Sequence, residues 1–116
     1  MMQVMLVAAG GALGAVTRYG VGIAALRLGM GFPWGTLIVN VIGGLAMGLL
    51  AARTEDINLR LLLGVGVLGG FTTFSAFSLE TVRLMQSQPH LAALYVASSL
   101  VLSIGACWLG LVLGRP

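Results

Sequence analysis

The sequence predicts an all-α membrane protein built from four transmembrane helices. Of its 116 residues, 59% are hydrophobic and only 8% are charged, and the mean hydropathy is +1.06. A soluble domain usually carries about 25% charged residues, so this chain has too few to cover a water-facing surface. The apolar runs are continuous, whereas the strands of a membrane β-barrel alternate between apolar and polar residues.

Four apolar segments predict the four spans of a single domain. A helix needs about 20 apolar residues to cross the hydrocarbon core, and each segment is long enough. We expect the first to be a retained span rather than a signal peptide, because no basic stretch precedes its apolar run. The second follows the turn sequence GMGFPWG, in which Pro33 can start a helix. The spans are expected at about residues 2–28, 34–52, 59–86 and 91–113.

The third span is expected to be broken near its middle, where it reads GGFTTFSAFS (residues 69–78). Gly69 and Gly70 lack side chains, and the Thr and Ser residues beside them can hydrogen-bond the backbone locally. A break at membrane depth frees carbonyl and N–H groups, which are tolerated only inside protein or along a polar cavity. Broken helices in transporters bind Na⁺ with such carbonyls. The alternative is a glycine kink sealed by Ser and Thr, without an ion.

Polar and aromatic side chains recur at helical spacing in the spans. Asn40 either links helices or lines a path, and Thr36 lies one turn earlier on the same face. The hydroxyls at positions 95, 99 and 103 share one helix face, as either a polar track or helix–helix contacts. The Phe residues at positions 71, 74 and 77 either form a packing stripe or turn positive ring edges toward an anion.

Glycine pairs spaced four residues apart predict close helix packing, because small residues let two helix backbones approach each other. The 18 glycines include four such pairs: Gly10/Gly14, Gly44/Gly48, Gly66/Gly70 and Gly110/Gly114.

The charges exclude several function classes. There is no Lys, and the six Arg residues are dispersed, so no basic cluster indicates nucleic-acid binding. We find no nucleophile–base pair, phosphate-binding loop or metal cluster, so neither an enzyme nor an organic cofactor is expected. The arginines show no clear excess at either end of a four-span chain: residues 53, 60 and 115 lie at one end, and 27 and 83 lie at the other, with Arg18 on the half of the first span nearer that second end. Such a balance is compatible with insertion in both orientations.

Three segments closely resemble the Fluc, or CrcB-type, fluoride channels: GALGAVTRY (Gly11–Tyr19), GTLIVNVIGG (Gly35–Gly44) and GGFTTFSAFSLE (Gly69–Glu80). The resemblance covers nearly the whole chain. It implies a fluoride-selective channel that passively exports F⁻ across the cytoplasmic (inner) membrane of a prokaryote and so relieves fluoride toxicity. It also implies an antiparallel, dual-topology homodimer in membrane lipid, with two pores and a structural Na⁺ at the dimer axis.

The resemblance also implies roles for individual residues. Backbone carbonyls of Gly69 and Thr72 would hold the Na⁺. Arg18 matches the first-span arginine, and Glu80 matches the acid after the break. The residues expected along the fluoride pore are Asn40, Phe74, Phe77, Tyr95, Ser99 and Ser103, with further hydroxyls from Thr36, Thr73 and Ser75.

Two other function classes remain. A small proton-coupled exporter of the four-helix multidrug type shares the size, but it needs a carboxylate within the first span, and residues 2–28 contain none. A structural subunit that only packs against a partner explains the glycines, but not Asn40 together with the hydroxyl row.

Overall fold

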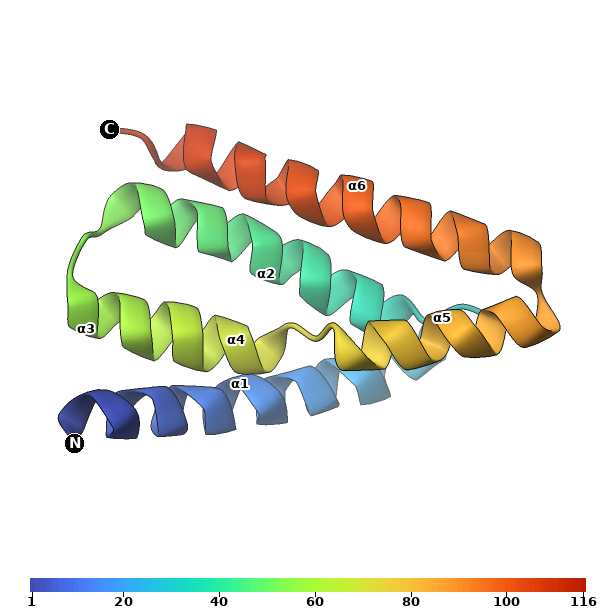
Figure 1. Cartoon of the computed structure of the whole chain (residues 1–116), viewed down its shortest axis with the longest axis horizontal. Helices are drawn as coiled ribbons and strands as arrows, with labels where there is room; N and C mark the ends of the chain where they lie inside the picture. The colour runs from blue at the N-terminus through green and yellow to red at the C-terminus, as the bar shows by residue number, and fades with distance from the viewer.

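Four long helical segments lie side by side in the computed structural model, which describes residues 1–116. Each is long and apolar enough to cross a membrane, and the chain has no strands; the segments are Met2–Leu28, Trp34–Arg53, Ile57–Ser87 and Pro89–Gly114. Both termini lie at the same end of the molecule (Figure 1). The prediction of an all-α chain with four candidate membrane spans is therefore confirmed.

Three of the four segments contain one long α-helix each, and the third is made of several pieces. Helix α6 begins at Pro89, where proline is favoured because the first helical N–H needs no partner. Helix α3 begins after Asp56, whose carboxylate accepts the N–H groups of Asn58 and Leu59 at 2.8 and 3.2 Å. The elements are α1 (Met2–Ala25), η1 (Leu26–Leu28), α2 (Trp34–Arg53), α3 (Ile57–Leu59), η2 (Arg60–Leu68), α4 (Gly69–Phe71), α5 (Ser75–Ser87) and α6 (Pro89–Gly114).

The third segment is interrupted at residues 72–74, within the stretch of residues 69–78 where a break was predicted (Figure 1). Thr72 is extended, with φ −87° and ψ 160°, whereas Gly69 and Gly70 remain helical in α4. Gly70 serves packing, because a Cβ there would lie 2.6 Å from the Gly11 carbonyl oxygen of α1. Before the break, η2 is a π-helix, in which the Gly69 N–H reaches the Gly64 carbonyl five residues earlier. No pattern along the chain indicates this wider helix.

Glycines form the closest contacts between the helices, and the prediction made from their spacing is confirmed. A Cβ at Gly66 of η2 would lie 2.9 Å from the Cα of Gly10 in α1. A Cβ at Gly110 of α6 would lie 3.1 Å from the Cα of Gly48 in α2. The glycine pair of α1 thus packs against the pair that spans η2 and α4, and the glycine pair of α2 packs against α6. Backbones that approach this closely gain dispersion contacts along their whole length.

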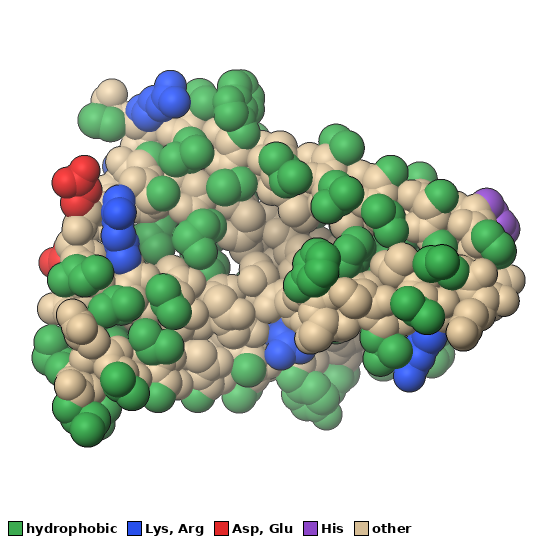
Figure 2. Space-filling view, in the orientation of Figure 1, with side chains coloured by type: hydrophobic (Ala, Val, Ile, Leu, Met, Phe, Trp, Pro, Cys, Tyr) green, Lys and Arg blue, Asp and Glu red, His purple; other side chains and the backbone are tan.

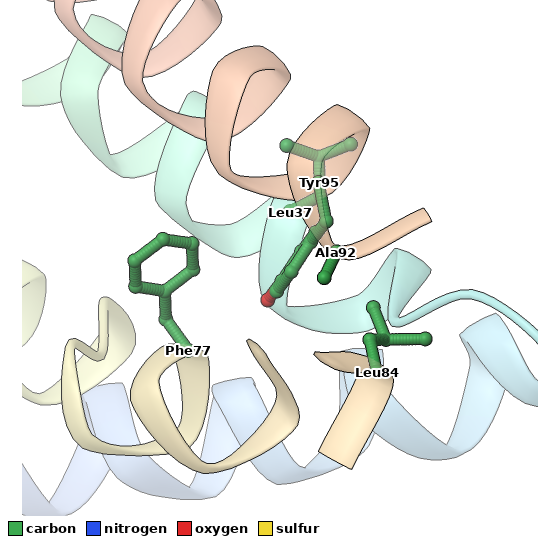
Figure 3. Packing of buried hydrophobic residues seen from close by; sticks show 5 residues of the cluster. All are labelled: Leu37, Phe77, Leu84, Ala92 and Tyr95. Carbon is green, nitrogen blue, oxygen red and sulfur yellow. The ribbon is translucent and has the colours of Figure 1, made fainter. Parts of the chain in front are cut away.

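The buried apolar core is small and lies between α2, α5 and α6 (Figure 3). Only 17 of 116 residues are buried, so most large apolar side chains face outward, as lipid-facing side chains do. Figure 2 shows hydrophobic side chains spread over one face, with the visible acidic side chains gathered at the end that holds the α2–α3 link. The core cluster consists of Leu37, Phe77, Leu84, Ala92 and Tyr95.

The glycine contacts predict that Gly14→Ala destabilises the fold. The added Cβ would overlap the Val67 carbonyl oxygen and lie 2.8 Å from the Phe71 nitrogen, and backbone atoms cannot swing aside. Overpacking of this kind costs about 1–3 kcal/mol, so we expect the midpoint of thermal unfolding in detergent to fall by several degrees.

The matched control is Gly20→Ala, on the same helix. A Cβ at Gly20 meets nothing within 4 Å, and alanine favours a helix over glycine by about 1 kcal/mol. The control should therefore melt at or above the wild-type midpoint. Equal midpoints for the two variants would contradict the proposed packing role of Gly14.

Candidate functional site

A groove of about 470 Å³ lies where α2 and α6 meet the interruption of the third segment. Its lining mixes an amide, hydroxyls, backbone and two aromatic rings, and it contains no Asp, Glu, Arg or His. It brings together eight of the sequence-predicted residues: Asn40, Gly69, Thr72, Thr73, Phe74, Phe77, Ser99 and Ser103.

Asn40 of α2 fixes the interrupted backbone with two hydrogen bonds. Its Nδ2 donates to the Thr73 carbonyl oxygen at 3.0 Å, and its Oδ1 accepts the Thr73 N–H at 2.8 Å. The side chain thus replaces both helical partners that Thr73 lost at the break. An amide nitrogen carries two hydrogens, and the second finds no acceptor within the chain. Asn40 therefore links two segments and also lines the groove, which combines the two alternatives that the sequence left open.

Two further side chains satisfy backbone groups at the interruption. Arg18 of α1 donates from Nε to the Gly70 carbonyl oxygen at 3.1 Å, so it supports the end of α4 from outside the groove. Thr73 accepts the Ala76 N–H on Oγ1 at 3.1 Å and thereby stabilises the first turn of α5.

The carbonyl oxygens of Gly69 and Thr72 accept no hydrogen bond within the chain. In a continuous helix Gly69 would receive the Thr73 N–H, but Asn40 takes it. Thr72 would receive the Ala76 N–H, but the Thr73 hydroxyl takes it. Both residues line the groove. Unpaired backbone carbonyls are the ligands that a hard monovalent cation takes at a helix break, so this donor set fits the Na⁺ that the resemblance implied.

Two serine hydroxyls of α6 are buried without partners. The Oγ atoms of Ser99 and Ser103 lie one turn apart on the groove side and make no hydrogen bond. An unpaired buried hydroxyl costs about 1–3 kcal/mol, so both groups need an acceptor or water that the chain does not supply. The adjacent Ser98 differs, because it donates to the Leu94 carbonyl oxygen at 2.7 Å.

The three phenylalanines of the third segment separate into two kinds. Phe71 is buried and does not line the groove. Phe77 is also buried, but its ring forms part of the groove wall, and Phe74 stands beside it with a centroid distance of 5.4 Å. Phe74 is 74% exposed, which leaves one side of the groove open at this ring.

Besides Arg18, four of the predicted residues lie outside the groove. Tyr95 is completely buried, and its hydroxyl donates to Oε1 of Glu80 at 3.1 Å. Figure 3 shows its ring beside Phe77, extending from α6 toward α5. Glu80 and Thr36 line a second cavity, of about 320 Å³, beside the loop that joins α1 to α2. Ser75 is exposed, with its Oγ 3.3 Å from Oγ1 of Thr73.

Several residues that line the site were not predicted to do so from the sequence. Gly43, Gly44, Met47 and Cys107 also line the groove. For the two glycines a signal existed, since they follow Asn40 by three and four residues on a helix and therefore share its face. Phe32, in the loop between α1 and α2, packs on Tyr95, and no pattern along the chain indicates that contact.

Comparison with known proteins gives a consistent answer over almost the whole chain. The family model described as "CrcB-like protein, Camphor Resistance (CrcB)" matches residues 5–111. A "Fluoride-specific ion channel FluC" of Caulobacter sp. (strain K31) is 52% identical, covering 99% of this chain and 96% of its own length. A protein of the same name from Agrobacterium fabrum is also 52% identical, covering 99% of this chain and 98% of its own length. The chain described above therefore belongs to the CrcB family.

Proposed function

We propose that this protein is a fluoride-selective channel that passively exports F⁻ across the inner membrane of a bacterium and so relieves fluoride toxicity. The structural observation that carries the proposal is the pair of buried, unpaired hydroxyls of Ser99 and Ser103 in one groove with Asn40. The names of relatives about 50% identical over nearly the full length support the identity of the ion.

The groove offers the kind of donors that a small anion needs. Fluoride is strongly hydrated, so a selective path must replace its water with several close donors. The serine hydroxyls and the free Asn40 N–H supply hydrogen bonds, while the edges of Phe74 and Phe77 supply a weaker positive field. The absence of carboxylates from the lining avoids repulsion of the anion. In this proposal Thr73 lies along the path, and Thr36, Ser75 and Tyr95 lie at its margins.

We also propose that the single 116-residue domain works as an antiparallel, dual-topology homodimer with two paths. The arginines support this arrangement, because neither end of the chain carries a clear excess. The open side of the groove at Phe74 gives a second copy a place to complete each path. A Na⁺ at the axis would be held by the Gly69 and Thr72 carbonyls, whose oxygens carry partial negative charges.

Fluoride efflux from liposomes tests the proposed function directly. Vesicles that hold the purified protein and internal potassium fluoride should release F⁻ when valinomycin lets K⁺ leave with it and so balances the charge. A fluoride electrode measures the release. Potassium chloride vesicles should show no comparable Cl⁻ release. Equal release of the two ions would disprove selectivity, and fluoride release that requires a proton gradient would favour the small-exporter class.

Asn40→Asp should abolish the flux. The change removes the donor to the Thr73 carbonyl and places a negative charge in the groove. Two like charges 4 Å apart repel by about 4 kcal/mol at an effective dielectric constant of 20, so the efflux rate should fall by about a hundredfold or more. Asn58→Asp makes the same chemical change at an exposed position and should leave efflux unchanged. Wild-type flux in Asn40→Asp would remove Asn40 from the path.

Phe74→Ile should slow the flux while the dimer stays intact. The isoleucine loses the ring edge and also the aromatic contact with Phe77, which is worth about 0.5–1.5 kcal/mol, so we expect roughly two- to tenfold slower efflux. Trp108→Ile is the control, since Trp108 is an exposed aromatic residue outside the groove. Size-exclusion chromatography checks the oligomeric state. If both variants match the wild type, Phe74 does not face the ion.

A further inference from the structure

Phe32 is the one aromatic residue of the α1–α2 loop that packs into the helical core. Its ring meets Tyr95 edge-on, with a centroid distance of 5.4 Å and an interplanar angle of 84°. It also lies 4.8 Å from the ring of Trp34. Phe32 lines the cavity that contains Glu80, but it does not reach the groove. Its contact with the groove is therefore indirect.

The backbone of the loop holds the Phe32 ring in this place. Pro33 has φ −80° and ψ 68°, and the Trp34 N–H donates to the Phe32 carbonyl oxygen at 2.9 Å. These values describe an inverse γ-turn, in which the proline ring restricts the central residue. On the other side of Phe32, Gly29 has φ +109°, which lets the chain turn sharply away from η1. The turn at the start of α2 thus fixes the position of the Phe32 ring.

The rings form a continuous series from the loop to the groove. Phe32 contacts Tyr95, Tyr95 contacts Phe77 at 5.1 Å, and Phe77 contacts Phe74 at 5.4 Å. Tyr95 has no exposed surface and lies between Phe32 and Phe77, with its hydroxyl on Glu80. Without the Phe32 ring, Tyr95 would border the cavity of about 320 Å³ and have room to turn into it.

We propose that Phe32 is a positioning residue for the ion path. The γ-turn holds its ring against Tyr95, and Tyr95 in turn holds Phe77 in the groove wall. The inference rests on the proposed function, because it assigns Phe32 a role in the same path. It predicts that the aromatic ring of Phe32, and not only its bulk, affects the rate of fluoride flux through Tyr95 and Phe77.

The test measures fluoride efflux for Phe32→Leu, Phe32→Tyr and the control Met30→Leu. Met30 is in the same loop but is 86% exposed. Loss of an edge-on ring contact costs about 0.5–1.5 kcal/mol, so Phe32→Leu should slow efflux roughly two- to tenfold. Phe32→Tyr keeps the ring, and the cavity beside it has room for the added hydroxyl, so its efflux rate should stay near that of the wild type. The efflux rate of Met30→Leu should equal that of the wild type. If Phe32→Leu does not fold, Phe32→Met replaces it in every comparison.

Two readouts separate positioning from simple stabilisation. The chain has two tyrosines, so 3-fluorotyrosine labelling gives two ¹⁹F resonances, and Tyr19→Phe assigns them. Phe32→Leu should shift the Tyr95 resonance, whereas Met30→Leu should not. In a Phe77→Ile background, Phe32→Leu should add little further slowing, because both changes act on the same ring series.

The outcomes distinguish this inference from the proposed function. Wild-type vesicles without fluoride flux would overturn the proposed function and the inference together. Wild-type flux combined with an unchanged rate or Tyr95 resonance in Phe32→Leu would overturn the inference alone. Fully additive slowing in the Phe77→Ile background would do the same, because Phe32 would then act by another route.

Discussion

The pairing of the Asn40 amide with the Thr73 peptide is the contact on which the rest of the site depends. Interrupting a helix at membrane depth leaves polar backbone groups without hydrogen-bond partners, and in hydrocarbon each unpaired group costs several kcal/mol. Asn40 returns one donor and one acceptor to Thr73, and Arg18 pairs with the Gly70 carbonyl. The break is therefore held by α1 and α2 together. An apolar residue at position 40 would leave both Thr73 groups without partners.

The same pairing determines which groups stay free. Because Asn40 and the Thr73 hydroxyl take two N–H groups, the carbonyls of Gly69 and Thr72 are left unpaired. The C-terminal end of α4 thus presents carbonyl oxygens, and the N-terminal end of α5 presents N–H groups. These ends carry opposite partial charges, so one interruption offers groups suited to a cation as well as groups suited to an anion. The glycine contacts between α1 and α4 hold this arrangement in register.

Features set by helical periodicity could be predicted from the sequence, and features set by the path of the chain could not. Hydropathy gave the four segments, and four-residue spacing gave the glycine contacts, since both follow from the geometry of one helix. The interruption was expected within residues 69–78 and lies there, but its exact place at residues 72–74 depends on a distant residue, Asn40, which provides the replacement partners. The contact of Phe32 with Tyr95 depends on how the γ-turn directs the loop, which no local pattern encodes.

The position of Tyr95 shows how an acidic residue can lie close to a path for anions. Helical spacing placed Tyr95 in one row with Ser99 and Ser103, yet only the serines line the groove. A tyrosine hydroxyl has one proton, and that of Tyr95 is donated to Glu80, so it is unavailable to an anion in this arrangement. The ring lies between the Glu80 carboxylate and Phe77. In the proposed channel, Tyr95 therefore acts mainly by holding the carboxylate away from the groove and supporting the ring that faces the ion.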